Sequence, residues 1–351
     1  MKNTIKLFGI IALAAIIGFA MIGCDGDGGG GDDDPIDPID PPGVYIAGYY
    51  VDADDNSIAC YWKDGVKKDL TNPSEMQALG DLITVANGRI YVAGSYEDED
   101  NDGYCYWTVN GTTITKTSLT DLDEFLDISA AGNNVYILGV ATDSKPYLWT
   151  NGTKGSELVP PTGFENGALS GSDVYVVGRT NTNSWYQKGV SGAKTQLNNA
   201  NAYIIAVSGN KVYTAGFSGY DNYYWVNTTK TKMNLPADAE AGQSAWTGQI
   251  KRIYGSGNNV YMLGSYEHTD GEDYDCYWIN STAYSLKSSL SSLTKPIIYN
   301  IAGTGSDAYI TGYHGSSGNY KACYWKNGTK TDLPAVTGSP DAEARGIFIV
   351  E

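Results

Sequence analysis

Apolar and polar residues alternate in short runs along the chain from residue 44 to its end. Each run covers about four to eight residues between glycine, asparagine or proline, which is the pattern of half-buried β-strands separated by turns. The runs ITVA (83–86) and IIAV (204–207) are typical, and each leads through an Asn-Gly or Gly-Asn turn into a second apolar run. Such turns favour tight β-hairpins. The pattern therefore predicts an all-β chain made of consecutive hairpins.

The second strand of each predicted hairpin carries one motif: an apolar residue, a tyrosine and, three residues after the tyrosine, a glycine. Seven copies begin at Val44, Ile90, Val135, Val174, Val212, Val260 and Ala308. Their tyrosines lie 38 to 48 residues apart. A third strand, often containing Cys-Tyr-Trp, and a short fourth strand complete each repeat. A period of about 40 to 50 residues built from short strands is typical of a β-propeller, in which each repeat forms one four-stranded blade.

The two ends of the repeat region are complementary. The first motif, at Val44, has no inner strand before it, and the last segment, ARGIFIVE (344–351), has no motif after it. We therefore expect the C-terminal strand to join the N-terminal blade and close the ring, which hides the sheet edges that an open array exposes. The prediction is a seven-bladed β-propeller of four-stranded blades over residues 44–351.

The N-terminus predicts export and membrane anchoring. Lys2 and Lys6 precede an apolar run that is short enough for a signal peptide and too short to be preferred as a spanning helix (1–23). The following Met-Ile-Gly-Cys resembles the lipobox of bacterial lipoproteins, which implies that Cys24 is acylated and becomes the mature N-terminus. The alternative is an ordinary signal peptide with an incidental cysteine. Residues 24–43 are rich in glycine, aspartate and proline and predict a flexible, self-repelling tether.

The charge of the chain limits its partners and location. The formal net charge is −17, which argues against nucleic acid or anionic lipid as a ligand because both need cationic patches. Acidic residues directly after Cys24 resemble surface-export signals of some bacterial lipoproteins, although Asp25 would indicate inner-membrane retention in enteric bacteria. The expected location is the bacterial cell envelope, anchored outside the cytoplasm by the lipid, with the outer membrane or cell surface favoured over the inner membrane.

Four cysteines occupy one position of the repeat, at Cys60, Cys105, Cys276 and Cys323. Because the rotation of the ring relates them, their side chains should point the same way round and not converge, which disfavours disulfides and a zinc site shared among them. A catalytic thiolate needs exposure and a nearby base, and the two histidines, His268 and His314, are expected in loops. We therefore predict that the cysteines fill the core as small apolar residues.

The third and fourth strands also resemble a known repeat. ACYWKDGVKKDL (59–70) and ACYWKNGTKTDL (322–333) are similar to the HAF repeat of secreted bacterial proteins, with the same tryptophan, glycine, aspartate and leucine. Cysteine and tyrosine stand where that repeat has phenylalanine and leucine, and its leading histidine is missing. The resemblance implies an extracytoplasmic propeller and implies no activity.

The four cysteine-containing repeats also carry long, mostly acidic loops between their second and third strands. In one of them Asp98, Asp100 and Asp102, followed by glycine, match the start of a calcium-binding loop. The residue at the twelfth position is Val109 and not glutamate, so the loop is not an EF-hand. Ca²⁺ is the only cofactor that the sequence indicates, and a solvated acidic loop is the alternative.

Five tyrosines follow the repeat glycine directly or one residue later: Tyr49, Tyr50, Tyr96, Tyr266 and Tyr313. If exposed at the mouth of the ring they would bind a glycan or protein ligand, and the alternative is that they pack the strand ends.

No catalytic residues are identified, because sialidase-type boxes, a Gly-x-Ser-x-Gly elbow and a histidine cluster are absent from the sequence. The sequence favours a binding or scaffolding module, and the alternative is a glycan-active hydrolase or lyase that uses acidic residues of the loop face.

Overall fold

The computed structural model describes residues 40–71, 77–98, 102–158, 163–180, 183–189, 191–198, 200–219, 221–239, 250–335 and 341–351. Its contacts divide the chain into two units, Met1–Asp37 and Pro38–Glu351, and every described residue belongs to the second. The predicted signal peptide, Cys24 and most of the predicted tether lie outside the described residues. Within the described ranges, no helix has the length and apolar character needed to span a membrane.

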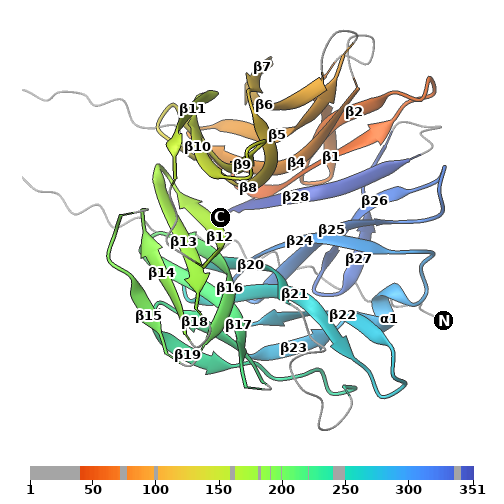
Figure 1. The fold of residues 1–351 in the computed structure, drawn as a ribbon. Coiled ribbons are helices and arrows are strands. Elements are labelled where there is room, and N and C mark those ends of the chain that lie inside the picture. Colours follow the sequence, from red (N-terminus) through yellow and green to blue (C-terminus); the bar gives the residue numbers. More distant parts are fainter. Residues whose placement is uncertain are drawn as a thin grey trace, which may run out of the picture. The chain divides into compact units, whose positions relative to one another are not determined.

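The second unit is a seven-bladed β-propeller, as the repeat predicted (Figure 1). Each blade is an antiparallel sheet of four strands, named below from the innermost strand outward. Blade 1 contains β28 (Ala342–Val350), β1 (Gly43–Val51), β2 (Ser57–Lys63) and β3 (Val66–Asp69). Blade 2 contains β4 (Gln77–Ala86), β5 (Arg89–Glu97), β6 (Asp102–Asn110) and β7 (Thr113–Leu119). Blade 3 contains β8 (Leu122–Ala131), β9 (Asn134–Ala141), β10 (Pro146–Thr150) and β11 (Thr153–Glu157).

The remaining blades follow in chain order. Blade 4 contains β12 (Phe164–Ser170), β13 (Asp173–Arg179), β14 (Ser184–Lys188) and β15 (Thr195–Leu197). Blade 5 contains β16 (Asn201–Ser208), β17 (Lys211–Ser218), β18 (Asp221–Val226) and β19 (Thr229–Lys232). Blade 6 contains β20 (Ile250–Ser256), β21 (Asn259–Glu267), β22 (Asp273–Ile279) and β23 (Thr282–Ser285), and the short helix α1 (Lys287–Leu290) follows it. Blade 7 contains β24 (Ile297–Thr304), β25 (Asp307–His314), β26 (Lys321–Lys326) and β27 (Thr329–Asp332).

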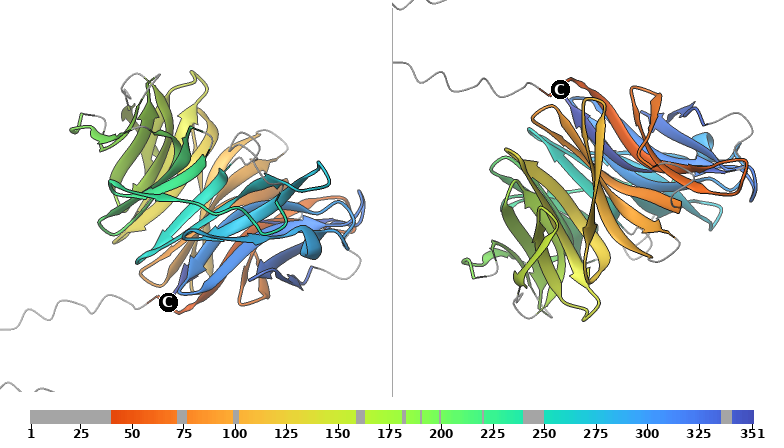
Figure 2. Two further views of the ribbon diagram at one scale, coloured as in Figure 1. Left: turned by 90° about the horizontal axis from the view of Figure 1, so that it is seen from below. Right: turned by 90° about the horizontal axis from the view of Figure 1, so that it is seen from above.

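The ring closes as predicted, because the C-terminal strand β28 pairs with β1 in the N-terminal blade. The innermost strands contact one another in sequence around the ring, and β28 contacts both β24 and β4. Figure 1 shows the blades side by side around a common middle, near which the C-terminus lies, and Figure 2 shows the same sheets from below and from above. Blade 1 is therefore assembled from the two ends of the repeat region.

The core consists of layers of side chains between neighbouring blades, each an apolar cluster built from two adjacent sheets. The tryptophan of the third strand faces the preceding blade: the indole N–H of Trp62 donates to the carbonyl of Pro334, which follows blade 7, at 2.8 Å. The motif tyrosine faces the following blade: the hydroxyl of Tyr213 donates to the carbonyl of Gly257 at 2.8 Å. In these repeats the tryptophan or the motif tyrosine thus ties a blade to its neighbour, whereas within the described ranges Trp185, Trp325 and Tyr91 form no such hydrogen bond.

Every innermost strand contains a β-bulge opposite the repeat glycine. In blade 2, Gly94 pairs with Gly80 and Asp81 is the extra residue. A Cβ on Gly94 would lie 1.9 Å from the carbonyl oxygen of Leu79. The same atom on Gly216 of blade 5 would lie 2.1 Å from a backbone carbonyl oxygen. The glycine recurs because the bulged backbone occupies the place of a side chain.

Candidate functional site

The bulges place seven residues in equivalent positions around the middle of the propeller, which we call the bulge ring. Its members are Asp81, Leu126, Glu165, Tyr203, Lys251, Tyr299 and Arg345. The ring lies near the start of the innermost strands, on the face that carries the connections between blades. Tyrosine and glycine of the motif repeat in all seven blades, whereas the bulge ring carries six residue types. Packing alone therefore does not determine these residues, and bulges often aim side chains at functional sites.

Three ring residues, from blades 7, 1 and 2, belong to a larger cluster of charged and aromatic side chains, which we call the Arg345 cluster. Its members are Tyr49, Asp81, Tyr299, Tyr313, Glu343 and Arg345. The guanidinium of Arg345 donates from Nη1 to Asp81 Oδ1 at 2.7 Å and from Nε to Glu343 Oε2 at 3.1 Å. One arginine of β28 thus bridges two carboxylates, one on its own strand and one on β4 of the next blade.

Aromatic rings enclose this ion-pair network. Arg345 Cζ lies 5.4 Å from the ring centroids of both Tyr49 and Tyr299, within the range of cation–π attraction. The hydroxyl of Tyr299 donates to Glu343 Oε2 at 2.8 Å, and its ring lies 5.9 Å from that of Tyr313. Glu343 is buried, while the side chains of Arg345 and Asp81 keep 28% and 26% of their surface exposed. The side chains of Arg345 and Asp81 therefore remain partly accessible to solvent, whereas Glu343 does not.

The electrostatics of the cluster follow from burial and pairing. Burial, together with the hydrogen bond and charge of Glu343, raises the pKa of Tyr299, and the pKa of Tyr49 is raised for the same reasons. Burial alone would lower the pKa of Arg345, but the charges of Asp81 and Glu343 outweigh it and raise that pKa. The guanidinium is therefore permanently charged and the tyrosines remain neutral hydrogen-bonding groups.

The bulge ring at blades 4 to 6 is also polar. Glu165 accepts from Nε of Arg179 at 2.7 Å, and this pair, with Thr180 and Asn201, lines a cavity of about 540 Å³. Lys251 forms an ion pair with Asp275 at 2.7 Å. These pairs lie within one blade, unlike the pair of Arg345 and Asp81.

Asp127 follows the bulge of β8 and joins two blades. Its Oδ1 accepts from the backbone N–H of Ile128 at 2.8 Å, and its Oδ2 accepts from that of Leu169 in blade 4 at 2.7 Å. Burial raises the pKa of Asp127 to about 7, although both hydrogen bonds oppose the shift. Because both oxygens are taken by backbone donors, this carboxyl group has a structural role.

A second cavity, of about 420 Å³, lies between blades 1 and 2 at the other ends of the strands. Tyr45, Lys63 and Val109 are among the residues that line it. The hydroxyl of Tyr45 donates to the carbonyl of Pro41, in the segment that precedes β1. This cavity is far from the bulge ring and contains no charged pair of the kind seen there.

The five predicted ligand-binding tyrosines fall into two groups. Tyr49 and Tyr313, directly after the repeat glycine, belong to the Arg345 cluster. Tyr50, Tyr96 and Tyr266 point to the opposite face of their strands, into the layers between blades. Tyr50, Tyr266 and Tyr313 are buried and Tyr49 and Tyr96 are partly exposed, so the five are not all at the surface, and the alternative that they pack the strand ends holds for the three buried ones. The alternation of side chains along a strand separates the two groups.

A lysine covers an aromatic ring in most of the layers between blades, and we call this arrangement the lysine cap. The lysine Nζ lies 3.6 to 4.3 Å from the ring centroid in five blades. The five pairs are Lys67 with Tyr50, Lys116 with Tyr96, Lys154 with Tyr147, Lys194 with Trp185 and Lys230 with Tyr223. Blade 6 departs from the pattern. Ala283 stands opposite its tryptophan, where blade 1 has the capping lysine, and Lys287 of α1 lies over Tyr274 instead.

The lysine cap explains where cysteine occurs. In blades 3, 4 and 5 the capped ring stands opposite the repeat glycine, at Tyr147, Trp185 and Tyr223, and the residue two positions after that glycine is small. In blades 1 and 2 the ring comes from that later position, at Tyr50 and Tyr96, and cysteine stands opposite the glycine. Cysteine is thus the small partner of an aromatic residue on the neighbouring strand.

The four cysteines of the repeats are free and fully buried, which confirms their prediction as core residues. Burial raises the pKa of each thiol. Cys60 packs against the preceding blade, in one cluster with Leu333. In blade 4 the position opposite the repeat glycine is filled by Trp185, which pairs with Gly178.

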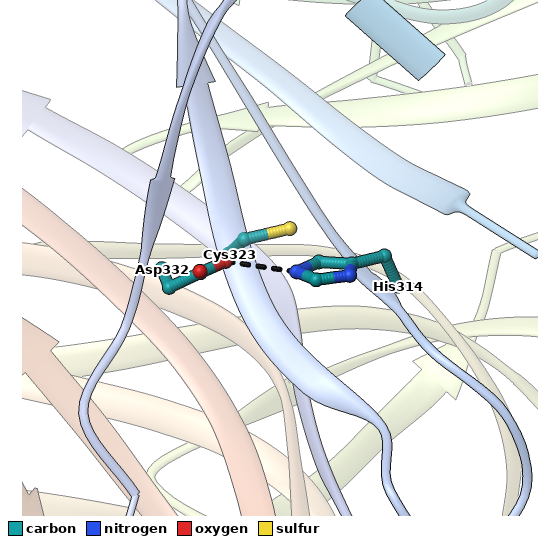
Figure 3. Close-up of side chains that lie close together, drawn as sticks. All are labelled: His314, Cys323 and Asp332. Carbon is teal, nitrogen blue, oxygen red and sulfur yellow. Dashed lines mark hydrogen bonds and ion pairs between the residues drawn. The ribbon is translucent and has the colours of Figure 1, made fainter. Parts of the chain in front are cut away.

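Blade 7 is the one blade whose capped residue is a histidine. His314 was expected in a loop, but it is the last residue of β25. Its Nε2 lies 2.8 Å from Lys330 Nζ and 2.9 Å from Asp332 Oδ1, and Cys323 lies beside it (Figure 3). His268 follows β21, where its Nδ1 lies 3.0 Å from Asp270 and 2.9 Å from Lys287 Nζ. Both histidines therefore contact a lysine and an aspartate.

The predicted calcium loop is only partly described. Asp98 forms an ion pair with Lys116 at 3.9 Å, and Asp102 begins β6, where it pairs with Glu97. Asp100 lies outside the described residues. Calcium binding at this loop stays a prediction.

No protein-family model matches the chain, and no curated protein matches it. Among solved structures, a mutant puromycin hydrolase complexed with PGG is similar at 10% identity and a TM-score of 0.51, over 85% of this chain and 53% of that one. A puromycin-hydrolyzing peptidase of Mycobacterium tuberculosis shares 11% identity with a TM-score of 0.48, over 83% and 52% of the two chains. The fucose-recognising, six-bladed lectin of Aleuria aurantia shares 14% with a TM-score of 0.41, over 76% and 97%. The chain spans about half the length of the two hydrolases, and at these identities the likeness concerns the fold alone.

Proposed function

We propose that this protein is a glycan-binding module whose ligand contacts the Arg345 cluster. The observation that carries the proposal is the diversity of the bulge ring: residues that pack the blades repeat, whereas six of the seven ring positions carry varied charged or aromatic residues and the seventh is Leu126. At blades 7, 1 and 2 these positions form one connected network across three blades, with Arg345 and Asp81 still partly exposed. A repeat protein that keeps its packing residues and varies one ring of partly exposed residues has the organisation of a binding surface.

The chemistry of the cluster favours a hydroxyl-rich ligand. Arg345 presents a planar fork of N–H donors and Asp81 presents carboxylate acceptors, a combination that pairs with vicinal hydroxyls. Tyrosine rings beside them supply apolar faces on which a sugar ring can stack. Because Asp81 and Glu343 offset the charge of Arg345, the cluster is less suited to a strongly anionic partner.

Binding is favoured over glycan hydrolysis by the state of the carboxylates. Asp81 and Glu343 are the acidic residues of the cluster, and both accept hydrogen bonds from one guanidinium. Glu343 is buried as well. A glycosidase needs two carboxyl groups presented to opposite sides of the scissile bond, and this pair is instead engaged with Arg345.

Glycan arrays followed by calorimetry with the best ligand test the proposal. We expect Arg345→Lys, which keeps the charge and loses the planar fork, to weaken binding about 10-fold or more. Glu165→Gln alters the same ring position in blade 4 and is the matched control, with unchanged affinity expected. Absence of any glycan ligand, or equal affinity of the Arg345→Lys variant and the wild type, would refute the proposal. Binding of a protein ligand alone would also refute it.

We also propose that the propeller is held to the bacterial envelope, outside the cytoplasm, through acylated Cys24. The proposal rests on the lipobox-like sequence and the acidic tether that follows it. Two or more acyl chains give stable anchoring, whereas one is marginal. Metabolic labelling with a fatty acid should mark the wild type and not Cys24→Ser, and the variant should move from the membrane to the soluble fraction. Labelling of both proteins, or of neither, would contradict anchoring at this residue.

A further inference from the structure

We propose that His314, Cys323 and Asp332 form a binding site for a divalent metal ion of the zinc class. One ligand atom from each residue can be chosen so that all three lie within 4.8 Å of one another. Among the described residues, no other group of three histidine, cysteine or acidic side chains meets this condition. Figure 3 shows the three side chains gathered in blade 7, with the imidazole directed at Asp332.

The register of blade 7 brings these residues together. Cys323 pairs with Gly312 on one side and with Asp332 on the other. His314 lies two residues after Gly312 and therefore on the same face of the sheet. On that face the imidazole of His314 lies beside Cys323 (Figure 3). The three ligands thus come from three adjacent strands of one rigid sheet, which is a favourable support for a preorganised site.

The ammonium of Lys330 already shows that this site holds a cation. It lies 2.8 Å from His314 Nε2 and 2.6 Å from Asp332 Oδ1. Nε2 and Oδ1 are themselves 2.9 Å apart. If Nε2 accepts a hydrogen bond from the lysine it cannot also donate to the aspartate, so two lone pairs then converge on one positive charge. A metal ion uses the same two lone pairs.

The third ligand distinguishes a metal from the ammonium. Cys323 is fully buried beside the imidazole, and its thiol gives a lysine only a weak hydrogen bond. A thiolate, an imidazole and a carboxylate together are the ligand types of zinc, whereas Ca²⁺ and Mg²⁺ prefer oxygen alone. In a tetrahedral zinc site the sulfur and nitrogen ligands are about 3.6 Å apart, so three ligand atoms that all lie within 4.8 Å of one another need shifts of at most about 1 Å.

Binding of the metal exchanges one cation for another. The Cys323 thiol releases its proton to solvent and the sulfur binds the metal, while the Lys330 ammonium leaves Nε2 and Oδ1. The Lys330 side chain is 24% exposed, so its ammonium can turn outward into water. Three protein ligands leave a fourth position for water or another ligand.

Blade 1 supplies a built-in comparison. Tyr50, Cys60, Lys67 and Asp69 occupy the positions of His314, Cys323, Lys330 and Asp332. Lys67 lies over the ring of Tyr50 at 3.7 Å and also pairs with Asp69. A neutral phenol is a far poorer zinc ligand than an imidazole. We therefore expect blade 1, with Tyr50, to form only a lysine cap, and blade 7, with His314 at the same position, to bind a metal ion.

Titration of the purified protein with Co²⁺ tests the proposal, because thiolate ligation gives Co²⁺ a near-ultraviolet charge-transfer band. We expect this band in the wild type, its loss on addition of Zn²⁺, and its loss in Cys323→Ser. His314→Tyr recreates the arrangement of blade 1, so it should keep the melting temperature and weaken binding about 100-fold or more. Lys330→Met removes the competing cation and should tighten binding about 10-fold, whereas Cys60→Ser should change nothing.

Three results would overturn the proposal. The first is absence of the charge-transfer band in both the wild type and Lys330→Met. The second is an equal band in His314→Tyr, and the third is an equal band in Cys323→Ser. Circular dichroism of each variant shows whether the propeller is intact, and the conservative His314→Tyr variant keeps the test valid if Cys323→Ser fails to fold.

Discussion

Moving the aromatic ring of one lysine cap to the neighbouring strand tests why cysteine recurs in this protein. In blade 1 the aromatic residue is Tyr50 and the small one is Cys60, whereas blade 3 has the reverse, with Ala141 and Tyr147. Tyr50 and Cys60 share one buried cluster and are diagonal neighbours on adjacent strands. We expect Tyr50→Ser and Cys60→Tyr each to destabilise the protein and the double variant to recover much of the loss.

The magnitudes follow from burial. Tyr50 is 4% exposed, so its loss removes a buried ring and leaves a cavity, at a cost of about 3–5 kcal/mol. Cys60 is fully buried, and a tyrosine forced in beside Tyr50 overpacks the layer by about 1–3 kcal/mol or more. In the double variant the new ring fills the space that the old one leaves, and Lys67 can cover it as Lys154 covers Tyr147 at 4.0 Å. The coupling energy should therefore be at least about 2 kcal/mol.

Urea unfolding of the four proteins, followed by tryptophan fluorescence, measures this coupling. The tryptophans are buried in every layer, so their emission reports loss of the ring. The slope of the transition must be similar in all four proteins for the free energies to be compared. If the two single effects simply add, the cysteine is not the steric partner of the tyrosine and our explanation of its position is wrong.

Three further predictions concern the bulges, the ring closure and Asp127. Gly94→Ala should lower stability by about 3 kcal/mol or more, because its Cβ would lie 1.9 Å from a carbonyl oxygen. Gly103→Ala in the same blade has its nearest neighbour at 3.6 Å and should be nearly neutral in the same thermal melts. Deletion of residues 342–351 should lower the melting temperature strongly, because β1 loses its inner partner, and an unchanged melting temperature would contradict closure by β28. The folded pKa of Asp127, about 7, exceeds its ordinary value of 3.8, so its contribution to stability is present at low pH and is lost as the pH rises from about 4 to about 7. Asp127→Asn should remove this part of the pH dependence, and identical pH profiles of wild type and variant would show that the shift is absent.

The repeat motif was sufficient to predict the architecture. Seven tyrosine–glycine motifs at a regular spacing, with an unpaired strand at each end, imply seven sheets and closure by the C-terminal strand. These features are local or periodic, and therefore a single sequence displays them. The bulge opposite each glycine was not predicted, because the sequence shows only that glycine recurs and not which backbone atom approaches it.

The Arg345 cluster was found only in part. Tyr49 and Tyr313 were identified because they follow the repeat glycine, but Arg345 and Asp81 are 264 residues apart in the sequence, and nothing local links them. Their contact exists because ring closure places β28 next to β4. The relation would have been visible only after aligning the seven innermost strands on their bulges, because Arg345 and Asp81 then occupy equivalent positions of two neighbouring blades.

The sequence by itself determined the number of blades and the order of their strands, because the repeat motif and its spacing set both. Only the tertiary structure decided which tyrosines are buried and which join Arg345, since burial depends on the neighbouring blade and not on the strand itself. The same holds for His314, which the sequence placed in a loop. The register of three strands puts it beside Cys323 and Asp332, because pairing across a sheet aligns residues that are distant in the chain.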